Sequence, residues 1–161
     1  MTSEDIHRIL TEKFSGENRI RLLKYALQDQ FLIDKNDLVE LCMELYSNPK
    51  LYFDYLACIT GIDNGPEKNT MEVLYHINSL VNELRIVLKV VLPRERPEVH
   101  TVSHIWRTAN WHEREAYDMF GILFTNHPDL RRILMPADWQ GFPLRKDYSE
   151  QYTYHGIKVK Y

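Results

Sequence analysis

The pair His112-Glu113 comes nearest to a catalytic motif in this sequence. In zinc proteases such a pair needs a second histidine four residues after the first, so that both rings share one helix face. Residue 116 is an alanine, and His112, Glu113 and Glu115 do not otherwise form a convincing ligand set. The sequence therefore predicts no metal site and no catalytic residue here. The rival hypothesis is a stand-alone hydrolase or metalloenzyme that uses these residues with His127, which stoichiometric zinc or iron in the pure chain would revive.

Other residues that often carry chemistry also lack a recognisable pattern. Cys42 and Cys58 are too few for an iron–sulfur cluster, and each lies in an apolar stretch, so we expect both to be buried and reduced. The glycines are isolated, and no Gly-x-Ser-x-Gly nucleophile motif occurs. His127 stands in a corner that Pro128 fixes. We favour a structural bond from His127 to a loop carbonyl over a role in proton handling.

The composition is that of an ordinary globular domain. The 161 residues are 44% hydrophobic and 27% charged, which is enough for one domain with a core. The net charge of -3 gives no reason to expect nucleic-acid binding. No apolar signal segment is present, and the most apolar run, 84–92, is far shorter than the ~20 residues that a membrane span needs. We expect any association with a membrane to come through partner proteins.

The hydrophobic periodicity predicts an α+β fold, with helices packed on a mostly antiparallel sheet. The expected elements are helices over 3–14 and 37–46, strands within 19–28 and over 52–62, a hairpin of 71–80 with 84–92, and a loop at 31–33. Gly16 and Asn48-Pro49 are expected to end the two helices, and Asn36 to cap the second.

A third helix is the most densely specified element. Asn110 and Glu113 have the spacing of a capping box, in which each side chain bonds the other residue's backbone N–H. Arg114 and Asp118 stand four residues apart and are expected to pair. Gly121 is expected to end the helix with a positive φ.

We expect a single domain with two parts, an α+β core over 1–126 and an extended C-terminal arm over 127–161 that binds a partner. The arm combines corners fixed by proline and glycine with arginines and tyrosines, the residue types that protein interfaces favour. A densely specified segment without a reaction centre indicates a surface that fits another protein. Its basic residues are expected to pair with acids in that partner or in this chain; they are Arg131, Arg132, Arg145 and Lys146.

The same part of the sequence resembles a known family. The runs that carry the likeness are Glu113-Arg114-Glu115, Tyr117-Asp118-Met119-Phe120-Gly121-Ile122, His127-Pro128-Asp129-Leu130-Arg131-Arg132-Ile133-Leu134, Met135-Pro136, Asp138-Trp139, Gly141, Pro143 and Leu144-Arg145-Lys146-Asp147-Tyr148. Phe53-Asp54-x-Leu56 and Ile59-Thr60-Gly61-x-Asp63 add to it, whereas the first 50 residues match only in general pattern. The chain resembles the 30-kDa subunit, also called the C subunit, of the proton-pumping NADH:quinone oxidoreductase, respiratory complex I.

The resemblance implies a non-catalytic structural subunit of the hydrophilic arm of that complex. The whole enzyme passes electrons from NADH through FMN and iron–sulfur clusters to quinone and translocates protons. These cofactors are expected in partner subunits and none in this chain. The expected partners are the D subunit, of the 49-kDa type, and also the B and I subunits, at the cytoplasmic side of the bacterial inner membrane. The alternative is an equivalent scaffold subunit in a membrane-bound hydrogenase or in a dehydrogenase fed by another donor.

The resemblance and the arm together give a set of signature and partner-interface residues. They are Glu113, Arg114, Glu115, Asp118, Phe120, Gly121, His127, Pro128, Asp129, Arg131, Arg132, Pro136, Trp139, Gly141, Arg145, Lys146, Tyr148, Tyr152 and Tyr154.

Overall fold

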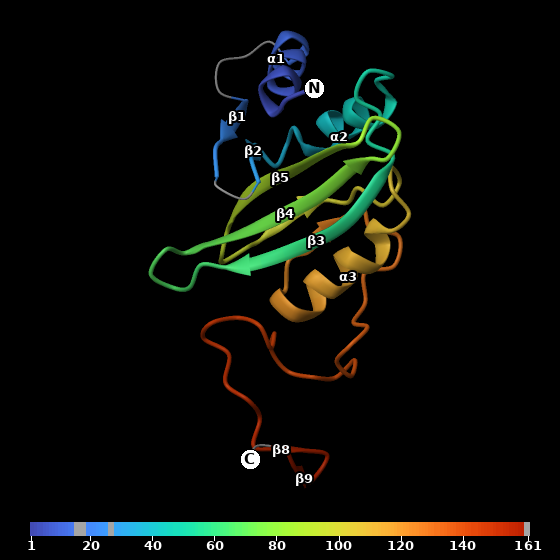
Figure 1. The fold of residues 1–161 in the computed structure, drawn as a ribbon. Coiled ribbons are helices and arrows are strands. Elements are labelled where there is room, and N and C mark those ends of the chain that lie inside the picture. Colours follow the sequence, from blue (N-terminus) through green and yellow to red (C-terminus); the bar gives the residue numbers. More distant parts are fainter. Residues whose placement is uncertain (15–18, 26–27, 160–161) are drawn as a thin grey trace.

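The computed structural model describes residues 1–14, 19–25 and 28–159, and a five-stranded sheet forms its centre (Figure 1). The strands lie in the order β1 (Ile20–Leu23), β2 (Gln30–Ile33), β5 (Leu84–Pro93), β4 (Thr70–Ser79) and β3 (Tyr55–Asp63). Of the strand pairs in this sheet, β2 with β5 is parallel and the others are antiparallel. The predicted α+β class with a mostly antiparallel sheet is therefore confirmed.

The β4–β5 hairpin is the long central pair of the sheet. Ser79 lies opposite Leu84, so the turn falls between them, as the sequence predicted. Successive side chains of a strand point to opposite faces, and one face of β4 enters the core. The side chains on that face that are 0% exposed are Met71, Val73, Tyr75 and Ile77.

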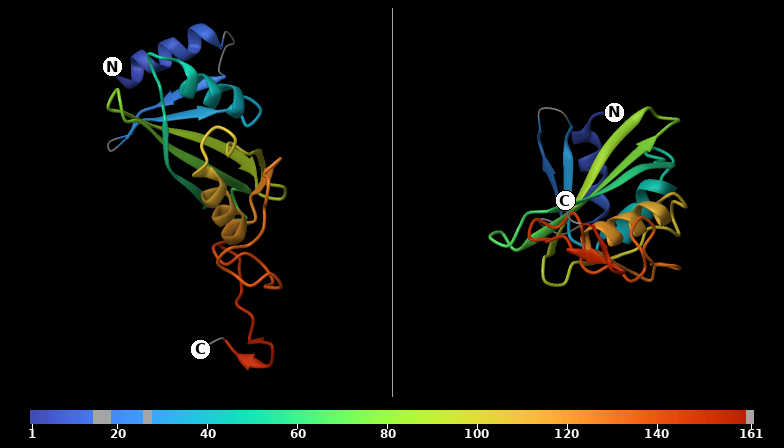
Figure 2. Two further views of the ribbon diagram at one scale, coloured as in Figure 1. Left: turned by 90° about the vertical axis from the view of Figure 1, so that its right-hand side faces the viewer. Right: turned by 90° about the horizontal axis from the view of Figure 1, so that it is seen from below.

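The described residues contain three helices, α1 (Ser3–Lys13), α2 (Leu38–Ser47) and α3 (Ala109–Phe120), which bury apolar side chains in one common core. A capping box between Thr2 and Asp5 begins α1, and Asn48 ends α2 as expected. Two views show α1 and α2 towards one end of the sheet, with α3 beside β3 (Figures 1 and 2). The sheet and α3 thus provide the body from which the arm departs.

The expected loop at 31–33 is wrong, because these residues belong to β2. Phe31 is 0% exposed and lies opposite Leu88 of β5. The strand has only four residues, too few to show a clear alternation. Its conformation is set by pairing with a strand far away in the sequence, which a local pattern does not contain.

The start of α2 also differs from the expectation. Its N-cap is Asp37, which makes no capping bond through its side chain. Asn36 instead bonds to Asp34 through its backbone N–H and its side-chain amide, both at 2.8 Å. The expected end of the first helix at Gly16 lies outside the described residues.

Both cysteines are free thiols. Cys42 in α2 is 0% exposed, as expected, but Cys58 in β3 is half-buried, so the expectation of two core thiols is wrong for one of them. Cys58 lies on a strand at the edge of the sheet, where a side chain has neighbours on one flank only.

Beyond the sheet the chain forms two small strand pairs. A parallel pair joins β6 (Glu98–His100) to β7 (Leu123–Thr125), and an antiparallel hairpin joins β8 (Thr153–Tyr154) to β9 (Ile157–Lys158). Residues 126–152 form turns and bends, with neither helix nor strand. The β8–β9 hairpin lies well away from the sheet, so the molecule is elongated (Figures 1 and 2). None of the described helices has the length and hydropathy to cross a membrane.

A substitution in β2 tests its place in the core. We expect Phe31→Ala to lower the free energy of unfolding by about 3–5 kcal/mol, since it leaves a cavity where an aromatic ring was buried. Leu32→Ala is the matched control, because Leu32 is half-buried on the opposite face of the same strand and should cost less than half as much. Urea denaturation followed by circular dichroism measures both, and equal losses would contradict this placement of β2.

Candidate functional site

The first half of α3 is held in position by the buried carboxylate of Glu113 and not by a capping side chain at its N-terminus. The N-cap is Thr108, and no side chain caps the helix. Glu113 is 0% exposed, and its carboxylate accepts hydrogen bonds from the Thr101 hydroxyl at 2.5 Å and the Val102 N–H at 2.7 Å. The capping box expected between Asn110 and Glu113 is therefore wrong, because Glu113 points into the core.

Burial sets the protonation of Glu113 and of His127 beside it. Loss of water raises the pKa of Glu113 to about 7, although its two hydrogen bonds act in the opposite direction. Nε2 of His127 lies 3.7 Å from Oε2 of Glu113, and both side chains are 0% exposed. Nδ1 of His127 accepts from the Asp129 N–H at 3.0 Å, so Nε2 donates to the Asn110 carbonyl at 3.1 Å. Burial lowers the pKa of His127 and favours this neutral ring, whose partner is a helix carbonyl instead of the expected loop carbonyl.

Asp118 anchors the start of the arm. Its side chain is 0% exposed, and Oδ2 accepts hydrogen bonds from three successive N–H groups, at 3.0 Å from Ile133, 2.7 Å from Leu134 and 2.9 Å from Met135. Arg132 donates to Oδ1 at 2.8 Å. Burial alone would raise the pKa of Asp118, but these four donors outweigh it and lower the pKa below its ordinary value. A charged carboxylate thus fixes three consecutive residues of the arm.

Arg132 closes a loop of the arm on itself. Its guanidinium also donates to the carbonyls of Asp118 at 3.1 Å, Trp139 at 3.1 Å and Gly141 at 2.9 Å. It lies 5.1 Å from the centre of the Phe142 ring. This planar group, with its fixed fork of donors, is therefore enclosed by four acceptors from two segments.

Arg114 does not form the expected pair with Asp118. Its Nε donates to the carbonyl of Arg131 at 3.2 Å, and its guanidinium lies 4.9 Å above the Trp111 ring. Asp118 has Arg132 as its cationic partner instead. Arg114 and Asp118 thus both bond to the arm, whereas their spacing in the sequence predicted a bond between the two.

The arm also covers the end of α3. Gly121 has a φ of 73°, as predicted, and a Cβ there would lie 2.5 Å from the Phe142 ring and 2.8 Å from Arg145. Arg145 donates to the carbonyl of Phe120 at 2.7 Å, and the Leu144 N–H donates to Met119 at 3.0 Å. The last carbonyls of a helix have no partner within it, so the arm satisfies two of them.

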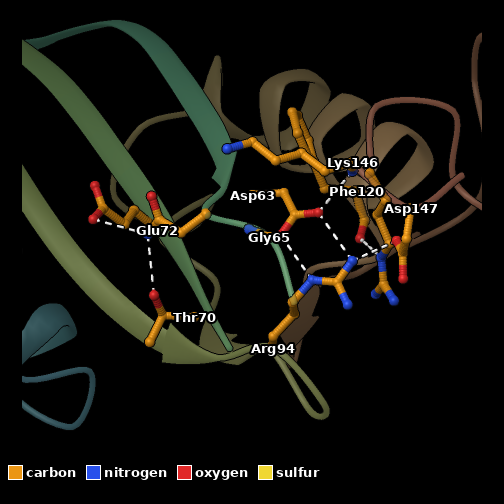
Figure 3. Close-up of polar contacts among 10 residues, drawn as sticks. Asp63, Gly65, Thr70, Glu72, Arg94, Phe120, Lys146 and Asp147 are labelled. Carbon is orange, nitrogen blue, oxygen red and sulfur yellow. Dashed lines mark hydrogen bonds and ion pairs between the residues drawn. The ribbon is translucent and has the colours of Figure 1, made fainter. Parts of the chain in front are cut away.

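Asp63, at the end of β3, holds the arm at residues 146 and 147 (Figure 3). Its carboxylate accepts two bonds from Arg94, at 2.8 and 3.1 Å, and one from the Lys146 N–H at 2.8 Å. The Gly65 N–H adds a bond at 2.9 Å, and Arg94 also bonds to Asp147. The Arg94 guanidinium, with the two amides, holds the pKa of Asp63 well below its ordinary value.

Aromatic contacts continue the arm to its last hairpin. The indole N–H of Trp139 donates to the Tyr148 hydroxyl at 3.0 Å, and the Tyr154 ring lies 5.2 Å from the Trp139 ring. Tyr154 in turn donates to Asp138 at 2.7 Å. The outer side of the arm leaves large apolar side chains exposed, namely Leu134 at 61%, Leu144 at 55%, Tyr152 at 64% and Ile157 at 69%.

The structure divides the predicted signature residues into an inner and an outer set. The buried or half-buried ones are Glu113, Arg114, Asp118, Phe120, Gly121, His127, Arg132, Trp139, Arg145, Tyr148 and Tyr154. The exposed ones are Glu115, Pro128, Asp129, Arg131, Pro136, Gly141, Lys146 and Tyr152. Sequence reasoning did not select Asp63, Arg94 or Phe142 as site residues. Asp63 stood in a motif that carried the resemblance, but no local signal marked Arg94 as its partner.

The four residues tested for metal chemistry, His112, Glu113, Glu115 and His127, do not form one ligand set. His112 and Glu115 line a groove beside β3, whereas Glu113 points into the core. Within the described part of the chain, no three side chains of His, Cys, Asp or Glu are grouped to hold a metal ion. Glu113 and His127 lie close together, but both side chains are fully buried.

Substitution of Asp118 tests the anchor of the arm. We expect Asp118→Asn to loosen the arm by about 2–4 kcal/mol, because it removes the charge that faces Arg132 and the three amides. Limited trypsin digestion with mass spectrometry should then show cleavage after Arg131 and Arg132 at least about tenfold faster than in the wild type. The control is Glu150→Gln, an exposed carboxylate in the same arm that bonds to no other described side chain. Equal cleavage rates in the Asp118 variant and the wild type would contradict the anchor.

The protonation of Glu113 is tested by the pH dependence of stability. A carboxyl whose pKa is raised on folding stabilises the fold fully below its unfolded pKa of 4.5, and this is lost as pH rises through about 7. The stability difference between wild type and Glu113→Gln should therefore fall by up to about 3 kcal/mol from pH 5 to pH 8. His127 acts in the opposite direction, because its lowered pKa makes the fold more stable as pH rises. Since both proteins contain His127, much of its contribution cancels when their stabilities are subtracted. Thermal melts at several pH values measure it, with Glu115→Gln as the exposed control, and a constant difference would be the contrary result.

Comparisons with known proteins agree on one family. The family model described as respiratory-chain NADH dehydrogenase, 30 Kd subunit, matches residues 31–154. The chain is 47% identical over 131 residues to the C subunit of the NADH-quinone oxidoreductase of Chlorobium phaeobacteroides, covering 81% of this chain and 78% of that protein. It is 42% identical to the corresponding subunit of Chloroherpeton thalassium, covering 98% of this chain and 65% of that protein.

A solved structure supports the same assignment, and a second shares the fold. A trypsin-resistant fragment (1–134) of Nqo5 superposes with a TM-score of 0.63 at 30% identity, covering 78% of this chain and 98% of the fragment. A chain of a membrane-bound sulfane sulfur reductase, an archaeal respiratory membrane complex, has a TM-score of 0.74 at 20% identity over 91% of this chain and 85% of that chain, and shares the fold. With the family model and the relatives in agreement, the chain belongs to the family of the 30-kDa subunit of the respiratory-chain NADH dehydrogenase.

Proposed function

We propose that this chain is a non-catalytic structural subunit of an NADH:quinone oxidoreductase and that residues 127–161 form the arm that docks it to its partners. One observation carries the proposal. Buried ionic anchors fix the inner side of the arm to α3 and β3, while the outer side presents exposed aromatic and aliphatic side chains. Large apolar groups on a preordered segment are the usual centre of a stable interface.

The partners follow from the family resemblance. We propose that the arm lies along the 49-kDa D subunit, near the B and I subunits, on the cytoplasmic side of the bacterial inner membrane. FMN and the iron–sulfur clusters belong to partner subunits in this proposal, and this chain holds no cofactor. Electron transport from NADH to quinone and the coupled translocation of protons are then properties of the whole complex, to which this chain contributes position and shape.

The alternative is an equivalent scaffold subunit in a hydrogenase or in a dehydrogenase fed by another donor. The observation in favour of this alternative is the fold shared with a chain of an archaeal sulfane sulfur reductase, which itself is a respiratory membrane complex. The NADH enzyme is favoured because the relatives that are 42–47% identical carry its name.

Affinity purification distinguishes these two functions. We expect a tagged copy, recovered from gently solubilised membranes, to bring with it flavin- and cluster-bearing subunits and to oxidise NADH with quinone. Recovery with a nickel-ligating large subunit would assign the chain to a hydrogenase. Recovery of this chain by itself would contradict the proposed function.

Substitutions on the exposed side of the arm test docking without disturbing its anchors. Leu134→Asp and Tyr152→Ala alter side chains that are 61% and 64% exposed, so we expect a folded chain whose recovery with the complex falls at least about tenfold. The matched control is Tyr25→Ala, a tyrosine that is 50% exposed beside β1, at the other end of the molecule. Charge reversal of Arg145 should also weaken the complex, but Arg145 bonds to Phe120 as well, so that variant loosens the arm itself. Wild-type recovery of both exposed-side variants would count against docking through the arm.

A further inference from the structure

We propose that the groove between β3 and α3 binds an extended segment of another polypeptide, which adds to the free edge of β3 as a further strand. The proposal rests on the proposed function, because the segment would come from a neighbouring subunit of the complex. This site, named here the β3–α3 groove, lies beside the arm, which contributes Leu144 to its lining.

The first support is the hydrogen-bonding pattern of β3. β3 is an edge strand, paired only with β4 among the described strands. The Asn64 N–H donates to the Thr70 carbonyl at 3.1 Å, which marks these two residues as a hydrogen-bonded pair. In an antiparallel ladder, hydrogen-bonded pairs alternate along the strand with pairs whose N–H and C=O groups point outwards. Counting back from Asn64 in this register, Ile59 and Gly61 belong to the second kind, so their N–H and C=O groups point away from β4. No hydrogen bond from another described residue reaches these four groups.

The chain itself already uses one position of this edge. The hydroxyl of Thr108, just before α3, donates to the carbonyl of Leu56 at 3.2 Å. The outer edge of β3 is thus accessible to donors near α3, and the next outward-facing residues along it lack such a partner. An open strand edge of this kind is a template for another strand.

The second support is the shape of the groove. It has a volume of about 390 Å³ and is lined on the side of α3 by Met119 and Phe120, and also by Leu144 of the arm. On the side of β3 the lining includes Ile59 and Gly61. Apolar side chains beside an open strand edge suit an extended peptide, whose alternate side chains enter the groove while its backbone bonds to the edge.

The charge at the rim of the β3–α3 groove indicates which residues the bound segment contains. Glu115 of α3 lines the groove, is exposed, and supplies its only carboxylate among the described lining residues. No described cation forms an ion pair with Glu115. A Lys or Arg in the incoming segment would fit beside this carboxylate. The inferred occupant is therefore an extended segment with alternating apolar side chains and one basic residue.

Hydrogen exchange in the assembled complex tests the groove directly. The tagged full-length chain is compared by residue-resolved mass spectrometry in isolation and in the purified complex. We expect the amides of Ile59 and Gly61 to exchange at least about tenfold more slowly in the complex, because each gains a hydrogen-bond acceptor. Retention of the chain in the complex with unchanged exchange at both amides would overturn the groove proposal alone. Loss of the chain from the complex would overturn the proposed function and this inference with it.

Charge variants and a cross-linker then identify the occupant. Glu115→Lys should reduce the protection at Ile59 about threefold, the order expected for one exposed ion pair. Glu12→Lys, a similar change on the exposed side of α1, should leave the protection unchanged. A photo-cross-linker on Cys58, which lines the groove, should capture a segment of a different subunit that contains a basic residue. Capture of a second copy of this chain would overturn the assignment of the occupant.

Discussion

The buried negative charge of Asp118 is the constraint on which the arm depends. A carboxylate removed from water is strongly unfavourable unless donors surround it, and here the donors are three successive arm amides and Arg132. The carboxylate of Asp118 has these four donors only when residues 132–135 fold back onto α3. A segment with neither helix nor strand thereby acquires a defined position.

The other buried charges extend the same principle. Asp63 draws Arg94 and the backbone of Lys146 together, and Arg132 is enclosed by carbonyls of the arm. The polar groups on the inner side of the arm are therefore used within the chain. What remains for a partner is an outer side with exposed apolar and aromatic groups. An arm that is ordered in advance loses less conformational entropy on docking than a disordered one.

The sequence predicted those features that depend on local patterns. The β4–β5 hairpin, the positive φ of Gly121 and the overall α+β class followed from alternation, turn residues and helix stops. The errors share one physical cause, which is competition from distant residues. Glu113 had the spacing of a cap but is bonded to Thr101, and Arg114 had the spacing of an Asp118 partner but bonds to the arm. Which bonding partner such a residue takes depends on whether its side chain is buried, and spacing alone does not reveal which helix face is buried.

The candidate site was likewise predictable in part. Prolines, glycines and charged residues drew attention to the segment 127–161, and Asp118 and Arg132 were among the signature residues, whereas Asp63 was not. The division into inner and outer residues was not, because it requires knowing that the arm turns back to α3. Arg94 illustrates the limit, since it reaches Asp63 from the end of another strand, a contact that no motif spans.

The most direct test of the account is the exchange rate of the arm amides in the isolated full-length chain. If Asp118 fixes the arm without help from a partner, the amides of Ile133, Leu134 and Met135 exchange at least about tenfold more slowly than unstructured peptides of the same sequence. Exchange at the unstructured rate, with the amides of β4 still protected, would mean that the arm folds only on its partner. That result would contradict the central claim.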